Sequence, residues 1–204
     1  MKLHWSPRSP FVRKVMVFAH EVGLADRIEK ISTKVAMTQP NTELMQVNPL
    51  GKIPALITDD GMVLYDSSVI CEYLDTLHKG TKLIPRESAR HWQALRWHAI
   101  GDNMLDTLVL WRNEGLRPQL QQSPETIAGF DLKTRTSVDT LEREAPTLAA
   151  ARFGIGHVAI GVALGYIDFR FPALAWRDGH PRIAAWYESF AQRPSARNTV
   201  PVDA

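Results

Sequence analysis

Cysteine is almost absent from this sequence, which has one, Cys71, among 204 residues. A single cysteine forms no disulfide within the chain, and it cannot complete a zinc site of the common cysteine-rich types. The seven histidines show no HxxxH or HExxH spacing, so no histidine-based metal motif is present either. We therefore expect a reducing, cytoplasmic setting, no metal centre, and a buried structural role for the thiol.

Long apolar runs and blocks of like charge are also missing. No stretch reaches the roughly 18 consecutive apolar residues of a membrane-spanning helix, and the opening MKLHWSPRSP lacks the apolar core of a signal peptide. The net charge is only +2, whereas nucleic-acid binding needs basic residues clustered on one face. We expect neither a membrane nor a nucleic-acid partner. The 45% hydrophobic and 23% charged residues are typical of a globular protein.

The first part of the chain, about 80 residues, alternates between strand and helix patterns. Apolar or alternating stretches predict strands at 3–5, 28–34, 55–58 and 62–65, and the helical patterns lie at 10–22, 38–45 and 68–77. Asp59-Asp60-Gly61 predicts the hairpin turn between the last two strands. This order predicts a compact α/β unit. In the first helix we expect four side chains to face away from the core: Arg13, Lys14, His20 and Glu21.

The second part of the chain carries helical patterns only. These predict helices at 85–114, 123–151, 155–171 and 180–193, and the third is apolar on nearly all sides. Ser123-Pro124-Glu125 has the cap, first-turn proline and acidic residue of a helix start. We therefore expect an α/β domain at 1–78, a connection at 78–85 and an all-helical domain at 85–204.

Five segments together resemble bacterial, serine-type members of the cytosolic glutathione S-transferase family. They are SPRSPFVRKV at 6–15, NPLGKIPAL at 48–56, LYDSSVICEYLD at 64–75, IGVALGYIDFRF at 160–171 and WYESFAQRPS at 186–195. The resemblance covers nearly the whole chain. It implies a thioredoxin-like domain that binds glutathione, followed by an all-α domain that carries the electrophile pocket. It also implies a homodimer that uses glutathione as a co-substrate and needs no cofactor.

Ser9 is the candidate catalytic residue. Redox relatives of the thioredoxin-like fold carry Cys-Pro-aromatic-Cys at this helix start, whereas Ser9-Pro10-Phe11-Val12 has no sulfur and cannot exchange disulfides as a dithiol. A hydroxyl at a helix N-terminus favours an anion. Lowering the pKa of a thiol from about 8.5 by about two units requires roughly 2.7 kcal/mol. A charge-assisted hydrogen bond contributes about 1.5–3 kcal/mol, and the helix end about 0.3–1 kcal/mol.

The hypothesis is therefore that the Ser9 hydroxyl donates a hydrogen bond to the sulfur of glutathione. The alternative is that Ser9 only caps the helix, because Ser-Pro is a common helix start. Ser6 is a rival hydroxyl, but it lies further from the predicted helix start.

The family resemblance implies a cis peptide bond between Ile53 and Pro54. A cis bond there turns the backbone outward, so that the N–H and C=O of Ile53 can pair with the cysteinyl part of a peptide ligand, as in strand addition. Sequence alone gives a cis bond a prior of only about 6%.

The glutamyl end of glutathione is expected at Asp66 and Ser67. Both are good N-cap residues for the following helix, and the same geometry can hold a carboxylate at Ser67 and an amine at Asp66. Lys34 or Lys52 is a candidate partner for the glycyl carboxylate, with a solvated surface lysine as the alternative for each. Phe11 completes the expected glutathione-binding set. Trp111 and Arg112 are candidates for the electrophile pocket, against core tryptophan and surface arginine.

One departure from the family pattern concerns the buried helix at 155–171. The family usually has Ser or Thr there, followed three residues later by Asp, and the two side chains form a reciprocal cap. Here the residues are Gly154-Ile155-Gly156-His157, so neither usual capping side chain is present. We expect weaker local stability at this helix start.

The sequence favours a glutathione transferase that conjugates the thiolate to hydrophobic electrophiles. Two alternatives keep glutathione as the ligand. One is a binding protein that has lost the reaction, because fold does not guarantee function. The other is a glutathione-dependent peroxidase or reductase, although the protein thiol that many such enzymes use is absent from this helix start.

Overall fold

Four strands form one mixed sheet in the computed structural model, which describes residues 1–203 of the chain. The strands are β1 (Lys2–Trp5), β2 (Glu29–Ser32), β3 (Ala55–Ile57) and β4 (Val63–Leu64), in the spatial order β2-β1-β3-β4. β1 and β2 are parallel, and the other two neighbouring pairs are antiparallel. All four predicted strands are therefore confirmed, β1 one residue longer than predicted and the other three shorter. Gly61, in the β3–β4 turn, has a φ of +87°, as a hairpin glycine often does.

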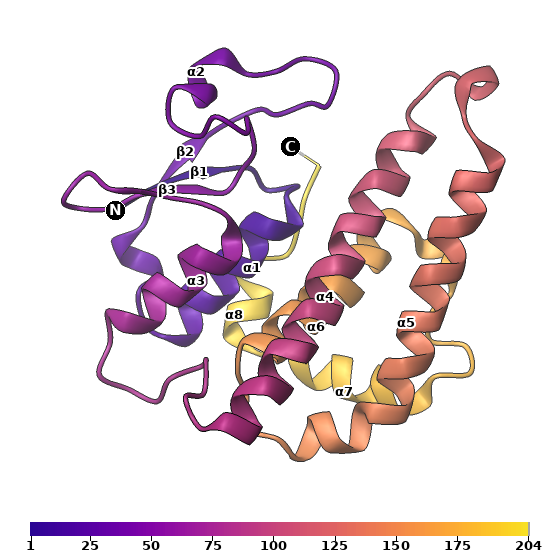
Figure 1. The fold of residues 1–204 in the computed structure, drawn as a ribbon. Coiled ribbons are helices and arrows are strands. Elements are labelled where there is room, and N and C mark those ends of the chain that lie inside the picture. The colour runs from indigo at the N-terminus through magenta and orange to yellow at the C-terminus, as the bar shows by residue number, and fades with distance from the viewer. Residues whose placement is uncertain (204) are drawn as a thin grey trace. The chain divides into compact units, whose positions relative to one another are not determined.

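Three helices accompany the sheet: α1 (Pro10–Glu21), α2 (Thr42–Met45) and α3 (Ser67–Thr76), with a 3₁₀ turn at Ala25–Arg27. α1 and α3 pack side by side (Figure 1). Their apolar faces and the sheet enclose a core that includes Leu3, Phe18, Leu56, Ile70 and Leu74, all fully buried. Cys71 is also buried, as expected. The first helix is confirmed almost to the residue, because Ser9, Pro10 and Gly23 mark its ends locally.

Two charged residues of α1 do not face solvent, which corrects the prediction. Lys14 is 0% exposed and its Nζ lies 3.4 Å from the hydroxyl of Ser68 on α3. Arg13 is buried as well, and its guanidinium donates to the carbonyl of Ala196 at 3.5 Å. The reason is that α1 is covered on more than one side, by α3 and by the short helix α8 (Pro194–Arg197). The sequence pattern of one helix shows a single apolar stripe. It does not predict that a second element will cover another side of the helix.

The chain divides into two compact units, and the boundary differs from the expected one. The first unit holds residues 1–85 together with the segment that starts at Pro194, and the second holds Arg86–Arg193. We expected the helical domain to continue to residue 204. Instead, α8 packs on α1, and Ser195 donates a hydrogen bond to Glu21. The second unit is thus inserted between two parts of the first.

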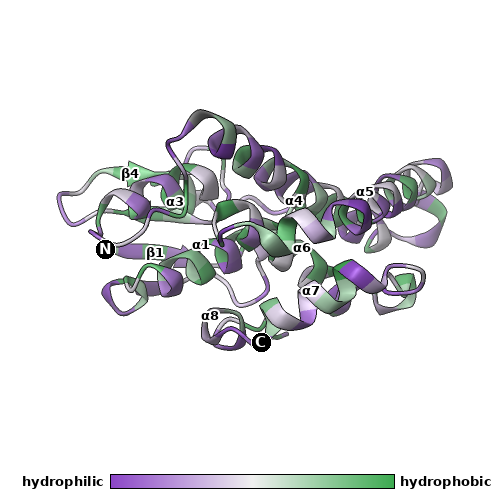
Figure 2. Cartoon of the chain, turned by 90° about the horizontal axis from the view of Figure 1, so that it is seen from below, coloured by the Kyte–Doolittle hydropathy of each residue, from purple (hydrophilic) through white to green (hydrophobic). Residues whose placement is uncertain are grey.

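The second unit consists of four long helices and two 3₁₀ turns. The helices are α4 (Ser88–Gly115), α5 (Pro124–Ala150), α6 (Ile155–Arg170) and α7 (Pro181–Ala191), and the turns are Gln119–Gln121 and Pro172–Leu174. This confirms the four predicted helices. α6 is buried from Ile155 to Ile167 and packs most extensively on α4. Figure 2 shows hydrophobic residues, in green, along both helices. Among the described residues, no helix is long and apolar enough to cross a membrane.

The start of α6 lacks the usual Ser or Thr and Asp, as expected from the sequence, but His157 supplies half of a reciprocal cap. The backbone N–H of Gly154 donates to Nδ1 of His157 at 3.2 Å. Nε2 of the same ring lies 3.0 Å from the carbonyl of Leu148, to which it must donate. These two bonds require the neutral ring. Burial lowers the pKa of His157, so no positive charge stands at the positive end of the helix dipole at neutral pH.

Candidate functional site

One edge of the sheet brings four segments of the first unit together. β1 and β2 are parallel, with Trp5 opposite Ser32, so the residues that follow each strand leave at the same edge. β3 runs the other way and starts there, with Ala55 opposite His4. β4 is antiparallel to β3 and therefore ends there. The segments 6–9, 33–34, 53–54 and 65–67 consequently meet at this edge, which holds every residue predicted to contact glutathione except Phe11 and Lys52. These two lie within two residues of the segments in the chain.

Ser9 is the N-cap of α1. Its hydroxyl oxygen accepts from the N–H of Val12 at 3.3 Å, and its own N–H donates to the Ser6 carbonyl at 3.2 Å. A hydroxyl can accept and donate at once, so the cap leaves the Ser9 proton available to a ligand. Pro10 has no N–H, and within the described residues the Phe11 N–H has no hydrogen-bond partner. The first turn of α1 thus offers two donors beside each other.

The Ile53–Pro54 peptide bond is cis, which confirms the expectation from the family resemblance. The side chain of Ile53 is buried. Its backbone N–H and C=O have no hydrogen-bond partner in the part of the chain that the structure describes. Pro54 directly precedes β3, so this unpaired backbone continues the strand outward. The arrangement can add a short extended peptide to the sheet.

Ser67 is the first residue of α3, and Asp66 is its N-cap. The Asp66 carboxylate accepts from the N–H of Ser68 at 2.9 Å. Ser67 is only 1% exposed, and neither its N–H nor its hydroxyl is bonded to any described residue. Two donors at the positive end of a helix suit a carboxylate. The exposed Asp66 carboxylate beside them suits an ammonium group.

Lys34 and Lys52 are both exposed. The backbone carbonyl of Lys34 accepts from the side chain of Asn41 at 3.0 Å, and that of Lys52 accepts from Asn48 at 2.8 Å. Neither ammonium group forms an ion pair with another described residue. Lys34 thus lies at the sheet edge and Lys52 directly before the segment 53–54 that reaches it.

Trp111 and Arg112 lie on α4 in the second unit. The ring of Trp111 packs against that of Phe171, with a centroid separation of 4.7 Å and an interplanar angle of 35°. Both residues are half-buried. Their assignment to the electrophile pocket stays a prediction.

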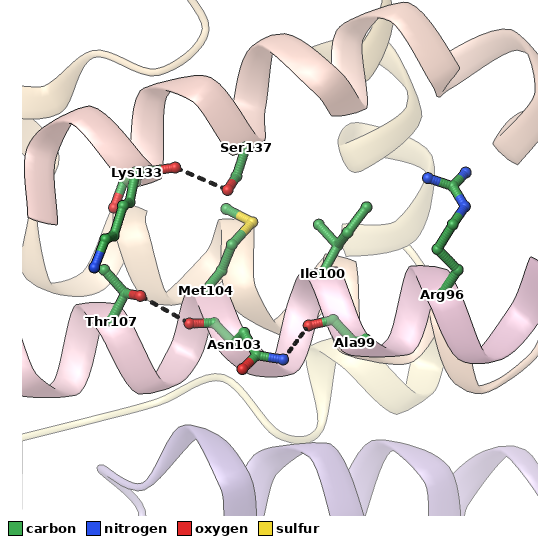
Figure 3. Close-up of a pocket in the computed structure, with 9 residues that line it drawn as sticks. Arg96, Ala99, Ile100, Asn103, Met104, Thr107, Lys133 and Ser137 are labelled. Atoms are coloured by element: carbon green, nitrogen blue, oxygen red, sulfur yellow. Dashed lines mark hydrogen bonds between the residues drawn. The ribbon is translucent and has the colours of Figure 1, made fainter.

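A surface hollow of about 430 Å³ lies between α4 and α5 of the second unit (Figure 3). Its lining does not include Trp111 or Arg112. Its polar side chains are largely bonded to their own helices. Asn103 donates to the Ala99 carbonyl at 2.8 Å, Thr107 to the Asn103 carbonyl at 2.9 Å and Ser137 to the Lys133 carbonyl at 2.8 Å. We assign no chemistry to this hollow. Within residues 1–203, no cluster of three or more His, Cys, Asp or Glu is arranged to hold a metal ion.

Sequence reasoning missed Asn48, which lies just before the segment that leads to Ile53. Its side chain is buried and bonds to the backbone of that segment at both ends. An Asn-Pro pair favours a turn. It gave no sign of which backbone groups the amide would contact.

Comparison with known proteins gives matches along most of the chain. Residues 8–77 match the family model described as "Glutathione S-transferase, N-terminal domain", and residues 124–189 match the corresponding C-terminal domain. A relative from Escherichia coli K12, the GST-like protein YibF, is 30% identical over 204 residues and covers 98% of each chain. That relative is itself described as uncharacterized.

Two solved structures are also similar. A glutathione transferase family member from Pseudomonas fluorescens Pf-5, with bound glutathione, is 43% identical, has a TM-score of 0.96 and covers 99% of both chains. A glutathione S-transferase from Methylobacillus flagellatus KT, with glutathione bound, is 34% identical, has a TM-score of 0.87 and covers 98% of this chain and 99% of its own. With both domains matched and a relative 30% identical along nearly its full length, this chain belongs to the glutathione S-transferase family.

Proposed function

We propose that this protein is a glutathione transferase that conjugates the glutathione thiolate to hydrophobic electrophiles, with Ser9 stabilising the thiolate. The observation that carries the proposal is the set of unpaired hydrogen-bonding groups at one sheet edge. These are the backbone of Ile53, the N–H and hydroxyl of Ser67 and the N–H of Phe11. Glutathione in the 43% identical Pseudomonas structure supports the same ligand here. We propose a homodimer on family membership alone.

Each part of the tripeptide has a matching group along the edge. The glutamyl carboxylate pairs with the donors of Ser67, and the glutamyl amine with Asp66. The cysteinyl backbone adds to Ile53 as a short strand. Lys34 or Lys52 meets the glycyl carboxylate. This arrangement leaves the sulfur beside the first turn of α1, where the Ser9 hydroxyl donates to it.

The reaction needs a sulfur anion and a well-placed electrophile. The thiol loses its proton to solvent on binding, and the thiolate then attacks an electrophilic carbon, forming a C–S bond as the leaving group departs with its electron pair. The protein contributes orientation and electrostatic stabilisation of charge. The same Pseudomonas family member has also been solved with S-(propanoic acid)-glutathione, at 42% identity to this chain. That structure supports an S-substituted glutathione as a species that this site accommodates.

Replacing Ser9 with alanine tests the proposal. We expect the pKa of the bound glutathione thiol to return toward its free value of about 8.5. Loss of about 2–3 kcal/mol of thiolate stabilisation corresponds to a decrease in kcat/KM of about 30- to 150-fold at neutral pH. The pKa of the bound thiol is measured from the ultraviolet absorbance of the thiolate as a function of pH. Turnover is measured with a chlorinated nitrobenzene substrate.

Ser123→Ala is the matched control, because Ser123 caps α5 in the same Ser-Pro context and accepts from Thr126 at 3.2 Å. Both substitutions remove an N-cap and should cost about 0.5–2 kcal/mol of stability, but only Ser9→Ala should affect the thiol. Ser6→Ala tests the rival hydroxyl, whose oxygen lies 3.4 Å from the Arg8 N–H. If the pKa of the bound thiol and the turnover of Ser9→Ala equalled those of the wild type, the proposed role of Ser9 would be rejected.

A further inference from the structure

Asn48 is held at the centre of the turn that leads to the cis-proline. It is 1% exposed, and its own N–H donates to the Leu44 carbonyl at 2.7 Å, which ties it to the end of α2. Its Nδ2 donates to the Lys52 carbonyl at 2.8 Å, and its Oδ1 accepts from the Leu50 N–H at 3.1 Å. A donor at one end and an acceptor at the other fix the orientation of the amide. The side chain is therefore hydrogen-bonded to both ends of the segment 50–52.

The carbonyl of Lys52 and the N–H of Ile53 belong to the same peptide group. That group is planar, so its C=O and N–H point in opposite, mutually fixed directions. A hydrogen bond to the Lys52 oxygen therefore also sets the direction of the Ile53 N–H. In the described chain that N–H is unpaired.

The turn itself does not depend on this bond. It is already closed by a hydrogen bond from the Gly51 N–H to the Asn48 carbonyl at 2.9 Å, and Gly51, the residue that ends the turn, adopts a left-handed φ of +61° that glycine accepts without steric cost. The bond from Nδ2 to Lys52 reaches one residue further, to the peptide group that faces the sheet edge. Its specific effect is on the orientation of that peptide group.

We propose that Asn48 is a positioning residue for glutathione: by holding the Lys52 carbonyl, its amide aims the Ile53 N–H at the cysteinyl carbonyl of the ligand. This inference rests on the proposed function. Asn48 touches no reacting atom. It pre-orients a donor before the ligand arrives, which removes an ordering cost from binding.

The first test compares Asn48→Asp with the wild type by calorimetric titration with glutathione. Aspartate keeps the size of the side chain and an acceptor for Leu50, but presents an oxygen instead of a donor to the Lys52 carbonyl. We expect the Kd for glutathione to rise about 3- to 10-fold, the range of one misdirected hydrogen bond. KM for glutathione should rise similarly, with kcat nearly unchanged at saturating glutathione.

Thr58→Val is the matched control. Thr58 is also buried, and its hydroxyl lies within hydrogen-bond distance of the Asp60 carboxylate and, at 3.0 Å, of the Met62 carbonyl, but it follows the far end of β3. The substitution removes these hydrogen bonds from the turn that follows β3, so it costs at least as much hydrogen bonding as the change at Asn48. It should lower the unfolding temperature while leaving the Kd for glutathione within about twofold of the wild type.

A second ligand distinguishes loss of the positioning of the Ile53 N–H from a general disruption of the binding site. γ-Glutamylcysteamine lacks the cysteinyl carbonyl, so it gives the Ile53 N–H nothing to bind. Wild type and Asn48→Asp should bind it equally, although both bind it more weakly than the wild type binds glutathione. An equal loss of affinity for both ligands would assign Asn48 a structural role only and overturn the proposal.

A second variant of Asn48 and a measurement of backbone mobility complete the test. Asn48→Ala, which introduces no buried charge, replaces the aspartate variant if that one does not fold. In the wild type, nitrogen-15 relaxation should show the free-state Ile53 amide as rigid as those of β3, and a mobile Ile53 amide would also overturn the proposal. If the wild type itself does not bind glutathione, the proposed function fails. If the wild type binds and a folded Asn48 variant binds equally well, only the positioning role fails.

Discussion

At the scale of single residues, the hydroxyl of Ser9 can serve the fold and a ligand together. Its oxygen accepts from Val12 and so caps α1, while its proton is free to donate in another direction. The two readings of Ser9 that the sequence left open therefore do not compete. The same logic holds at Asp66, whose carboxylate caps α3 and remains exposed beside Ser67.

His157 makes the stability of the protein depend on pH. The ring is 4% exposed, and burial lowers its pKa; the bond to the Leu148 carbonyl partly opposes this, and the charge of Arg193 lowers the pKa further. Below about pH 6.5 the unfolded chain takes up a proton at this ring that the folded chain does not. The contribution to stability is therefore fully present above that pH and is lost as the pH falls below it.

We expect the free energy of unfolding to fall more steeply below about pH 6.5 in the wild type than in His157→Asn. The difference in slope should approach about 1.4 kcal/mol per pH unit, the limit for one proton. Urea denaturation between about pH 5 and pH 8 measures it. Asparagine can still accept from Gly154 but does not titrate. Parallel curves for the two proteins would show that His157 is protonated as easily in the folded state as in the unfolded one.

At the scale of elements, α4 and α6 approach each other closely because glycine leaves their backbones room. A Cβ built on Gly101 of α4 would lie 2.6 Å from the backbone nitrogen of Ile160 on α6. A Cβ on Gly156 of α6 would lie 2.6 Å from the Cβ of Trp97 on α4. Backbone atoms cannot move aside without separating the helices. These two positions therefore set the distance between the helices.

Gly101→Ala should lower the free energy of unfolding by about 3 kcal/mol, because overpacking outweighs the gain in helix propensity. Gly129→Ala on α5 is the control, since no atom lies within 4 Å of its built Cβ. That variant should gain about 0.5–1 kcal/mol from propensity alone. Chemical denaturation of both variants measures the contrast. If Gly101→Ala were as stable as the wild type, α4 and α6 would not lie as close together at Gly101 as the structure shows.

At the scale of the whole molecule, the chain leaves the first unit after Pro85 and returns to it at Pro194. The returning segment contributes the buried Ser195 and Ala196, which contact Glu21 and Arg13 of α1. The fold of the first unit is therefore complete only when the segment that starts at Pro194 is in place.

Ending the chain after Arg193 should destabilise the first unit by about 2–3 kcal/mol, the cost of losing the hydrogen bonds that join Ser195 to Glu21 and Arg13 to Ala196. Ending it after Thr199 removes only residues beyond α8 and should have little effect. Thermal unfolding in the presence and absence of glutathione measures both variants. Equal stability of the two shortened chains would mean that α8 adds nothing to the first unit.

The sequence by itself determined the order and type of the four strands and of helices α1–α7, because their signals are local, whereas it did not predict α8. Ser9-Pro10, Asp66 and Ser123-Pro124 mark helix starts, and Asp60-Gly61 marks a hairpin. The family resemblance, and not the spacing of residues, gave the cis bond before Pro54. The candidate glutathione contacts other than Lys34 were also found in this way, since they lie in short quoted motifs.

Only the tertiary structure decided the burial of Arg13 and Lys14, the capping role of His157, and the grip of Asn48 on Lys52. Arg13 contacts a carbonyl 183 residues away, and no local pattern encodes such a contact. The direction of one buried amide likewise depends on which backbone groups the completed turn presents to it. Propensity and periodicity act over a few residues, whereas burial and side-chain pairing follow from which distant segments pack together.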